Sequence, residues 1–355
     1  MGQADTRRRS RCALLSVPVV NVALSVILLL TFQAASGQAI KNAAAKKKIL
    51  VSGLDESSIA ALQRSAPANV RILATSPDRI FAEIGDADAL ISPQLTGDQL
   101  RAARQLKWVQ ILNAGVEGTA PLLNGSAIIL TNLKIVLGPE VADHAMALLL
   151  ALTRCLYETI PAQAKRESPS GVGPLVELRG KTAVIVGLGG VGEEIAERAQ
   201  AFGMKIIGVD PQAAPPPQIV KPDQIDRVLP LADVVFVSAP ETAATRGMIG
   251  PAQFQEMKPG AYFIAVSRGA LYSTDALVKA LASKRLAGAG LDATNPQPLP
   301  SNSPLWQFKD VVITPHIAGS SDGALTRVLE LLEANIRLFA AGQPLLNVVD
   351  KSRGY

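Results

Sequence analysis

Cysteine is almost absent from this chain, whose 355 residues contain only Cys12 and Cys155. One of them lies in an N-terminal leader and the other in an apolar helical pattern, so we predict no intramolecular disulfide and no metal site. Histidine is equally scarce, with only His144 and His316. Imidazole is the side chain most often used for proton transfer near neutral pH, and these two positions therefore narrow the candidates for an acid or base.

Aromatic and charged residues are also few, at 4% and 18%, and no long polar tract is present, which argues against extensive disorder. With 48% hydrophobic residues, a chain of 355 residues can build two sizeable cores, and we expect two domains. Of the net charge of +5, the first 39 residues carry +3 through four Arg and one Asp, which leaves +2 for the rest. The basic balance belongs mostly to the leader, so we expect no nucleic-acid partner.

The leader, residues 1–39, is typical of a signal peptide or a membrane anchor. Four arginines precede an apolar stretch at about residues 13–32, and small residues suited to cleavage follow at 34–39. The basic flank should stay on the cytoplasmic side, which would place the folded part outside. We therefore expect an exported (periplasmic or secreted) or membrane-anchored protein that meets the membrane only through this segment. The protein would be cytoplasmic if the leader is not functional.

Short apolar runs alternate with amphipathic segments from Lys48 onward, which predicts an α/β fold with parallel sheets covered by helices. Between the two halves we expect a long apolar helix at residues 141–156 and then a loop rich in Pro, Ser and Gly at 161–174. In the second half, Ser273 is the expected N-cap of a helix. The last helix is expected at about residues 322–341.

Residues 182–210 have the pattern of a complete dinucleotide-binding unit: an apolar strand, a glycine-rich turn, a helix and a second strand. Gly187 permits the tight turn out of the strand, Gly189 lets the backbone approach a pyrophosphate, and Gly192 lets the helix lie close to the sheet. The phosphate would then lie at the positive end of the helix. The predicted cofactor loop comprises Gly187, Gly189, Gly190, Val191 and Gly192.

Asp210 ends the second strand of this unit and would accept hydrogen bonds from the adenosine ribose hydroxyls. A carboxylate there repels a 2′-phosphate, and the following Pro211 and Gln212 supply no cation to hold one. NAD is therefore favoured over NADP. On the intervening helix, Val191, Ile195 and Phe202 are predicted to share one apolar face.

Two polar side chains stand at the carboxyl ends of predicted strands, the edge of an α/β sheet at which ligands bind. Arg268 follows the apolar run 262–266, and its guanidinium could clamp a carboxylate or polarise a carbonyl. His316 follows the run 311–313 and is the candidate acid or base. His144 lies in an apolar helix on the same face as Val141 and Leu148, which favours a structural role.

Residues 48–348 resemble the D-isomer-specific 2-hydroxyacid dehydrogenases, whose motifs appear here in order. The motifs are LNAGVEG at 112–118, VADHAMALLLALTR at 141–154, the glycine motif, MKPGAYFIAVSRGALYSTDAL at 257–277, AGAGLDATNPQPLP at 287–300, SPLW at 303–306 and DVVITPHIAG at 310–319.

The resemblance implies roles for residues at these motifs. Arg268 would bind the substrate carboxylate and carbonyl together with the backbone amides at Ala114 and Gly115, and His316 would be the acid/base. Asp292 would contact the nicotinamide carboxamide. Pro240 and Thr245 would lie in the loop beneath the cofactor.

The resemblance also implies the domain organisation. Two doubly wound parallel-sheet domains, Rossmann-like or flavodoxin-like, are expected, with the cofactor domain inserted into the substrate domain. The substrate (catalytic) domain would comprise residues 47–140 and 319–350, and the NAD-binding domain residues 141–318. A homodimer formed through the region of the 141–156 helix is expected.

One position departs from the family. Gln297 occupies the place of the family's third catalytic residue, a Glu that would raise the pKa of His316 by its charge. Gln297 can orient the imidazole by a hydrogen bond but adds no charge. The same Gln appears in NAD-dependent formate dehydrogenases, which need no proton transfer because formate supplies only a hydride.

Three hypotheses follow. The first is an NAD-dependent oxidoreductase that transfers a hydride between nicotinamide and C2 of a small 2-hydroxy or 2-keto acid, as glyoxylate and hydroxypyruvate reductases do. The second is formate oxidation, motivated by Gln297. The third is a dinucleotide-binding module without turnover, since the family also includes a corepressor that senses dinucleotide.

Overall fold

The computed structural model describes residues 46–169, 171–212 and 218–355. The expected signal peptide or anchor at residues 1–39 lies outside these ranges. The described chain forms two sheets, one of five strands and one of seven, and all strand pairs within them are parallel.

The first sheet has the strand order β2-β1-β3-β4-β5. Its odd and even residues face different cores: Ile49 and Val51 lie in one, and Leu50 lies in the other. Helices therefore cover both faces. The strands are β1 (Lys47–Val51), β2 (Val70–Ala74), β3 (Ala89–Ser92), β4 (Trp108–Ile111) and β5 (Ile129–Thr131), and the helices are α2 (Glu56–Ser65), α3 (Ile80–Glu83), α4 (Gly97–Ala102) and α5 (Ala120–Leu123).

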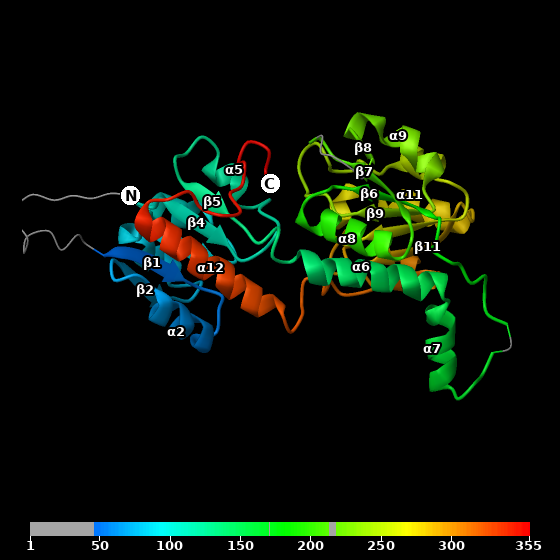
Figure 1. Ribbon diagram of the computed structural model, residues 1–355, viewed down its shortest axis with the longest axis horizontal. Coiled ribbons are helices and arrows are strands. Elements are labelled where there is room, and N and C mark those ends of the chain that lie inside the picture. The colour runs from blue at the N-terminus through cyan, green and yellow to red at the C-terminus, as the bar shows by residue number, and fades with distance from the viewer. Residues whose placement is uncertain (1–45, 170, 213–217) are drawn as a thin grey trace, which may run out of the picture. The chain divides into compact units, whose positions relative to one another are not determined.

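The last helix of the chain, α12 (Ala324–Ala341), packs against this first sheet, as Figure 1 shows. Its Leu332 and Ile336 lie in the same core as Ile49. Asn335 is fully buried, and its amide donates to Gln110 Oε1 on β4 over 3.3 Å. Both ends of the described chain therefore build the first domain, which confirms the predicted insertion of the second.

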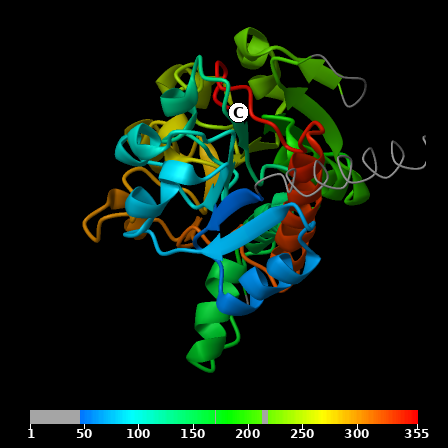
Figure 2. The same ribbon diagram turned by 90° about the vertical axis from the view of Figure 1, so that its left-hand side faces the viewer.

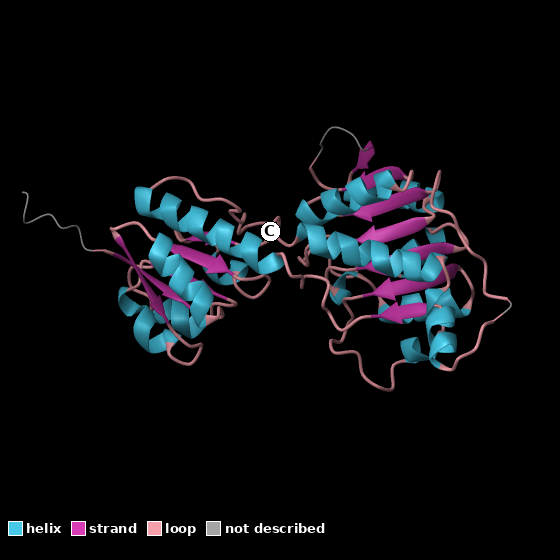
Figure 3. Ribbon diagram, turned by 60° about the horizontal axis from the view of Figure 1, so that its bottom comes forward, coloured by secondary structure: helices cyan, strands magenta, loops and turns pink. Residues whose placement is uncertain are grey.

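The second sheet has the order β12-β11-β10-β9-β6-β7-β8, and helices cover both of its faces (Figure 3). The direction in which strands are added reverses between β6 and β9, and ligands of such sheets bind beside this point at the carboxyl edge. The strands are β6 (Thr182–Val186), β7 (Lys205–Val209), β8 (Gln218–Val220), β9 (Val234–Val237), β10 (Ala261–Ala265), β11 (Leu286–Leu291) and β12 (Val311–Ile313), and the helices are α6 (Gly138–Thr153), α7 (Leu156–Ala164), α8 (Gly190–Ala201), α9 (Ile225–Val228), α10 (Pro251–Glu256) and α11 (Thr274–Ala282).

The bounds predicted for the long apolar helix, 141–156, are wrong at both ends. Helix α6 begins at Gly138 and ends at Thr153, and after a break at Cys155, whose φ is +54°, α7 continues to Ala164. The two axes differ by 78°. The expected loop at 161–174 therefore starts inside a helix that includes Pro161. A left-handed backbone conformation at a residue other than glycine is uncommon and requires support from tertiary packing. Here the Cys155 side chain is buried. Local sequence propensity gives no signal for such a break.

Helix α7 projects away from the second sheet in Figures 1 and 2, and none of its residues is buried. Among the described residues no single helix is long and apolar enough to cross a membrane, and only the bent pair α6–α7 meets that test together.

Of two further predictions about helices, one is confirmed and one is wrong. Ser273 is confirmed as the N-cap of α11, because its hydroxyl accepts from Ala276 N. Phe202, predicted on the apolar face of α8 with Ile195, is instead the C-cap residue and 45% exposed. The helix ends before Phe202 could turn toward the sheet. The predicted α/β fold class is confirmed.

Candidate functional site

The glycine loop between β6 and α8 has the shape of a phosphate cradle. Gly187 adopts φ +94°, and a Cβ there would lie 2.5 Å from Ala239 N. At Gly192 a Cβ would lie 1.9 Å from Gly187 O, so no larger residue lets the helix approach the strand this closely. Gly189, the N-cap of α8, has open space in front of it. The loop therefore fits a pyrophosphate at the helix N-terminus.

The other two predicted loop residues begin α8. A Cβ on Gly190 would lie 2.7 Å from Lys134 O, so this glycine allows the segment before α6 to pack against the loop. Val191 is partly buried against the core between α6 and α8. Gly190 therefore allows close packing behind the loop, and Val191 anchors the start of α8 in the core.

Asp210 follows β7 and is tied to the glycine loop. Its Oδ2 accepts from Leu188 N and its Oδ1 from Gln212 N, both over 2.9 Å. The carboxylate therefore lies beside the cradle, where the ribose next to a bound pyrophosphate would lie.

Pro240 and Thr245 lie in one loop after β9. Thr245 Oγ1 donates to Pro240 O over 2.6 Å and accepts from Thr242 N over 2.8 Å. These bonds close the loop on itself. The structure thus places both residues in the loop at the carboxyl end of β9, the strand next to β6.

Arg268 lies three residues after β10 and meets the loop that follows β4 in the first domain. Its Nε is 3.1 Å from Glu117 Oε1, and a Cβ on Gly115 would lie 2.0 Å from its Nη2. The side chains of Arg268 and Glu117 are 24% and 31% exposed. Ala114 O accepts from Asn132 Nδ2 over 2.6 Å, which fixes the loop from behind. The structure therefore brings the guanidinium, Ala114 and Gly115 together.

His316 lies in the loop after β12 and adopts φ +58°, a left-handed conformation that is uncommon for a residue with a Cβ. Its Nδ1 lies 2.8 Å from Gln297 Oε1 and 2.6 Å from Gln297 Nε2. This contact leaves Nε2 as the ring nitrogen available for proton exchange. Burial lowers the pKa of His316, the positive charge of Arg268 lowers it further, and the negative charge of Asp292 opposes both effects.

Asp292 follows β11 and is only 2% exposed. Its Oδ1 accepts from Thr314 Oγ1 over 2.6 Å and from Ile317 N over 3.0 Å, and its Oδ2 accepts from Ala318 N over 3.0 Å. The carboxylate thus binds the loop on both sides of His316. This contact with the loop differs from the role that the resemblance implied for Asp292, which was to contact the nicotinamide carboxamide.

A cavity of about 390 Å³ lies beside these residues, and Trp306 borders it. Its lining residues are Asp292, Thr294, Gln297, Pro298, Leu299, Trp306, Ile313, Thr314, Pro315 and His316. The candidate acid/base therefore faces an accessible space. Among residues 46–169, 171–212 and 218–355, no group of His, Cys, Asp and Glu is arranged to bind a metal ion.

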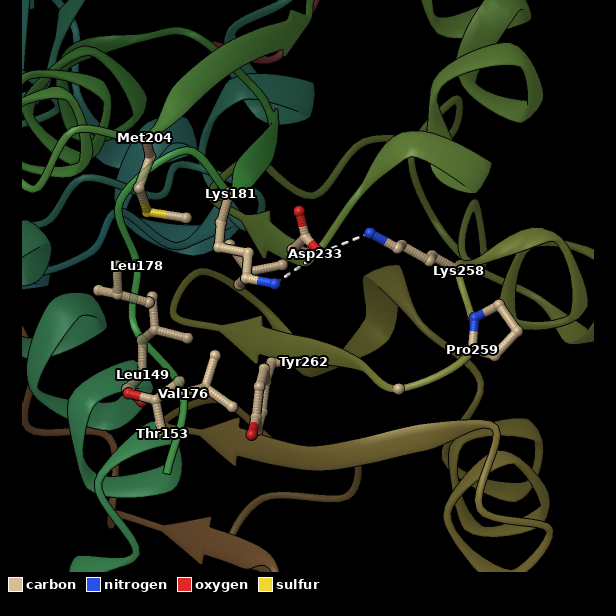
Figure 4. A pocket seen from close by; sticks show the side chains of 12 residues that line it. Leu149, Thr153, Val176, Leu178, Lys181, Met204, Asp233, Lys258, Pro259 and Tyr262 are labelled. Atoms are coloured by element: carbon tan, nitrogen blue, oxygen red, sulfur yellow. Dashed lines mark hydrogen bonds and ion pairs between the residues drawn. The ribbon is translucent and has the colours of Figure 1, made fainter. Parts of the chain in front are cut away.

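A second cavity, of about 200 Å³, lies at the opposite edge of the second sheet (Figure 4). Lys181, Met204, Asp233 and Gly260 line it, and each immediately precedes a strand. Asp233 pairs with the Lys258 amine over 2.7 Å. The cavity is at the amino ends of the strands and contains none of the predicted site residues, so it is separate from the candidate site.

Sequence reasoning missed three residues of the site. Glu117 lies in the LNAGVEG motif, but nothing in the sequence pairs it with Arg268. Thr314 lies within the DVVITPHIAG motif, two residues before His316, but nothing in the sequence gives its side chain a role. His144, predicted to be structural, lies 2.8 Å from Thr314 Oγ1 through its Nε2. The only available signal was that His144 is one of two histidines in the chain.

Comparisons with known proteins find relatives over most of this chain. The family described as D-isomer specific 2-hydroxyacid dehydrogenase, NAD binding domain, matches residues 146–318. A glyoxylate reductase of Thermofilum pendens is 32% identical over 78% of this chain and 85% of its own length. A D-3-phosphoglycerate dehydrogenase of Archaeoglobus fulgidus is 31% identical over 78% of this chain, which spans only 54% of that relative.

The fold also matches solved structures. The NADPH-dependent glyoxylate/hydroxypyruvate reductase of Sinorhizobium meliloti, in complex with NADP and sulfate, superposes with a TM-score of 0.75 at 25% identity. The match covers 87% of this chain and all of that one.

Proposed function

The chain belongs to the D-isomer specific 2-hydroxyacid dehydrogenases, and we propose that it is an NAD-dependent oxidoreductase acting on a small 2-keto or 2-hydroxy acid. The observation that carries this proposal is that Arg268, placed over Gly115, and His316 both follow parallel strands at the carboxyl edge of the second sheet. A guanidinium and a proton donor are the two groups that reduction of a 2-keto acid requires from the protein.

Each residue has a defined task in this reaction. Arg268 binds the substrate carboxylate together with the amides near Gly115, which orients C2. When bound, the nicotinamide supplies or accepts the hydride at C2. The imidazole of His316 holds the proton destined for the C2 oxygen in reduction and takes it back in oxidation. Gln297 orients the ring through Nδ1, so that Nε2 faces the substrate.

NAD is the proposed cofactor rather than NADP. Asp210 presents a carboxylate beside the glycine loop, where it would accept from ribose hydroxyls and repel a 2′-phosphate. The Sinorhizobium meliloti reductase is NADPH-dependent, and so the preference of this chain rests on Asp210 alone.

A panel of small keto acids tests the proposal. Purified protein lacking residues 1–39 should oxidise NADH with glyoxylate, hydroxypyruvate or a related keto acid, and more slowly with NADPH. If NADH binds but no member of the panel is turned over, the proposal is wrong, and a dinucleotide-binding module without turnover remains.

Formate oxidation is the second candidate, and Gln297 is the observation that favours it. A glutamine supplies no charge to stabilise an imidazolium, and hydride transfer from formate needs none. Formate-dependent NADH production with a rate that is flat from about pH 6 to 9 would support this function over the first.

We also propose a homodimer and export of the folded domains. Leu156 and Ile160 on α7 are 39% and 60% exposed, which suits an interface with a second copy. Export rests on the pattern of residues 1–39 alone. Mass spectrometry of the purified protein tests the proposed export, because it determines the mature N-terminus and detects any bound nucleotide.

A further inference from the structure

His144 on α6 is linked to the candidate acid/base through two hydrogen bonds. Its Nε2 lies 2.8 Å from Thr314 Oγ1, and Thr314 Oγ1 donates to Asp292 Oδ1 over 2.6 Å. The side chain of His144 is 20% exposed and that of Asp292 only 1%. The three residues come from α6 and from the loops after β11 and β12.

The number of protons available in these hydrogen bonds determines which ring nitrogen of His144 carries a hydrogen. A threonine hydroxyl has one proton, which Thr314 gives to Asp292, so it must accept a second bond rather than donate one. His144 therefore donates from Nε2 and is protonated at that nitrogen. The Nε2 atom lies 3.5 Å from Asp292 Oδ1, so an N–H at this nitrogen also faces an acceptor.

The Asp292 carboxylate holds the backbone around His316. It accepts from Ile317 N and Ala318 N after the histidine and from the Thr314 hydroxyl before it. His316 itself adopts φ +58°, a conformation that persists in a residue with a Cβ only when its surroundings enforce it. The His144 donor keeps the Thr314 hydroxyl turned toward Asp292, which completes this enforcement.

We propose that His144 is a positioning residue. Through Thr314 and Asp292 it holds the loop at residues 314–318 in the conformation that places the His316 imidazole against Gln297. His144 touches neither substrate nor cofactor in this role. The catalytic consequence rests on the proposed function, whereas the effect on the geometry of His316 does not.

Matched substitutions separate the hydrogen bonds from packing. Thr314→Val keeps the shape of the side chain but removes the hydroxyl, and Thr314→Ser keeps the hydroxyl. His144→Leu removes the donor, and His144→Gln keeps an N–H donor at a similar reach. Thr75→Val, which removes a hydroxyl at the end of β2 in the first domain, is the control.

In steady-state kinetics, Thr314→Val and His144→Leu should each lower kcat on the order of ten- to a hundredfold, because a small misplacement of a catalytic group is costly. The KM for NADH should stay within about twofold, since no cofactor contact is lost. Thr314→Ser, His144→Gln and Thr75→Val should retain most of the activity. The double variant should be no slower than the slower single variant, because both changes break one linked unit.

Imidazole NMR gives a readout that does not depend on turnover. The chain has two histidines, so the His144→Leu variant retains only the signal of His316. We expect this signal to shift and broaden in His144→Leu and in Thr314→Val, but to remain as in the wild type in Thr314→Ser. If His144→Leu does not fold, Thr314→Val carries the test.

The outcomes distinguish the two proposals. A wild-type protein inactive on every keto acid overturns the proposed function, and the NMR comparison still decides whether His144 positions His316. Unchanged His316 signals and kcat in Thr314→Val overturn the positioning role. Equal losses in Thr314→Val and Thr314→Ser overturn it as well, because the hydroxyl would then be irrelevant.

Discussion

The guanidinium of Arg268 is paired with the carboxylate of Glu117, Nε to Oε1 over 3.1 Å, directly above Gly115. Arg268 comes from the second sheet and Glu117 from the loop after β4 in the first. The carboxylate of Glu117 and the guanidinium of Arg268 both lie against Gly115, whose amide is proposed to bind the substrate carboxylate. If Arg268 binds substrate as proposed, a substrate carboxylate would have to compete with this internal anion.

Replacing Glu117 by Gln should strengthen substrate binding. A partly exposed ion pair is worth about 0.2–1 kcal/mol, so KM for a small keto acid should fall by about 1.4- to fivefold with little change in kcat. Keto acids with a second anionic group should gain more, because Glu117 repels that group. Steady-state kinetics with glyoxylate and a dicarboxylic keto acid measure both effects.

Glu333→Gln is the matched control, since Glu333 pairs with Arg337 on the exposed face of α12. It should leave KM unchanged. A rise in KM for Glu117→Gln would contradict the competition and would mean that Glu117 mainly orients Arg268 for the substrate.

The pH dependence of reduction should reflect the environment of His316. Burial and Arg268 lower its pKa, so the imidazolium that donates the proton is lost at a lower pH than for an ordinary histidine. The kcat/KM for keto acid reduction should therefore fall as pH rises, with a break below about 6.5, the usual value for histidine. Oxidation of the hydroxy acid needs the neutral ring and should rise over the same range.

Gln297→Glu should move this break to higher pH, because a carboxylate at Nδ1 stabilises the imidazolium. Reduction at pH 7 to 8 should then become faster. A pH profile that is identical in the wild type and in Gln297→Glu would show that His316 does not supply the proton.

Cofactor preference should depend on Asp210. In Asp210→Ala the repulsion of a 2′-phosphate and the acceptor for the ribose hydroxyls are both removed. The ratio of kcat/KM for NADPH to that for NADH should rise about tenfold or more, equivalent to roughly 1.4 kcal/mol. Asp223→Ala, an exposed position after β8, should leave the ratio unchanged. A wild type that already prefers NADPH would refute the role given to Asp210.

Self-association should depend on α7. Ile160 is 60% exposed on a helix with no buried residues, and a carboxylate at this position would be desolvated in any apolar interface. Light scattering coupled to size-exclusion chromatography should find a dimer for the wild type and a monomer for Ile160→Asp. The control is Phe81→Asp, which changes an exposed apolar residue on α3 and should remain dimeric. A monomeric wild type would end the proposal of a homodimer.

Features with a local cause could be predicted from the sequence alone. The glycine loop is one, because φ +94° at Gly187 and the close approach at Gly192 permit no other residue. The N-cap at Ser273 is another, since its hydroxyl bonds within the first turn of its own helix. The alternation of strands and helices follows equally from the periodicity of apolar residues, which reflects burial on each element.

Other features depend on residues far apart in the chain. The break at Cys155 is imposed by packing, and so the predicted helix ran through it. His144 was predicted to be structural from the apolar face it shares with Val141 and Leu148, and its hydrogen-bond partner Thr314, 170 residues away, could not be predicted from the sequence. The pairing of Glu117 with Arg268 likewise joins two domains.

The sequence by itself determined the fold class, the dinucleotide loop and the strand ends that carry Arg268 and His316, because short-range sterics and periodicity encode them. Only the tertiary structure decided which side chains surround these two residues. Glu117 lies beside the guanidinium of Arg268, and His144 lies beside Thr314 in the loop that carries His316. Both contacts result from the packing of distant segments, and no pattern along the chain predicts them.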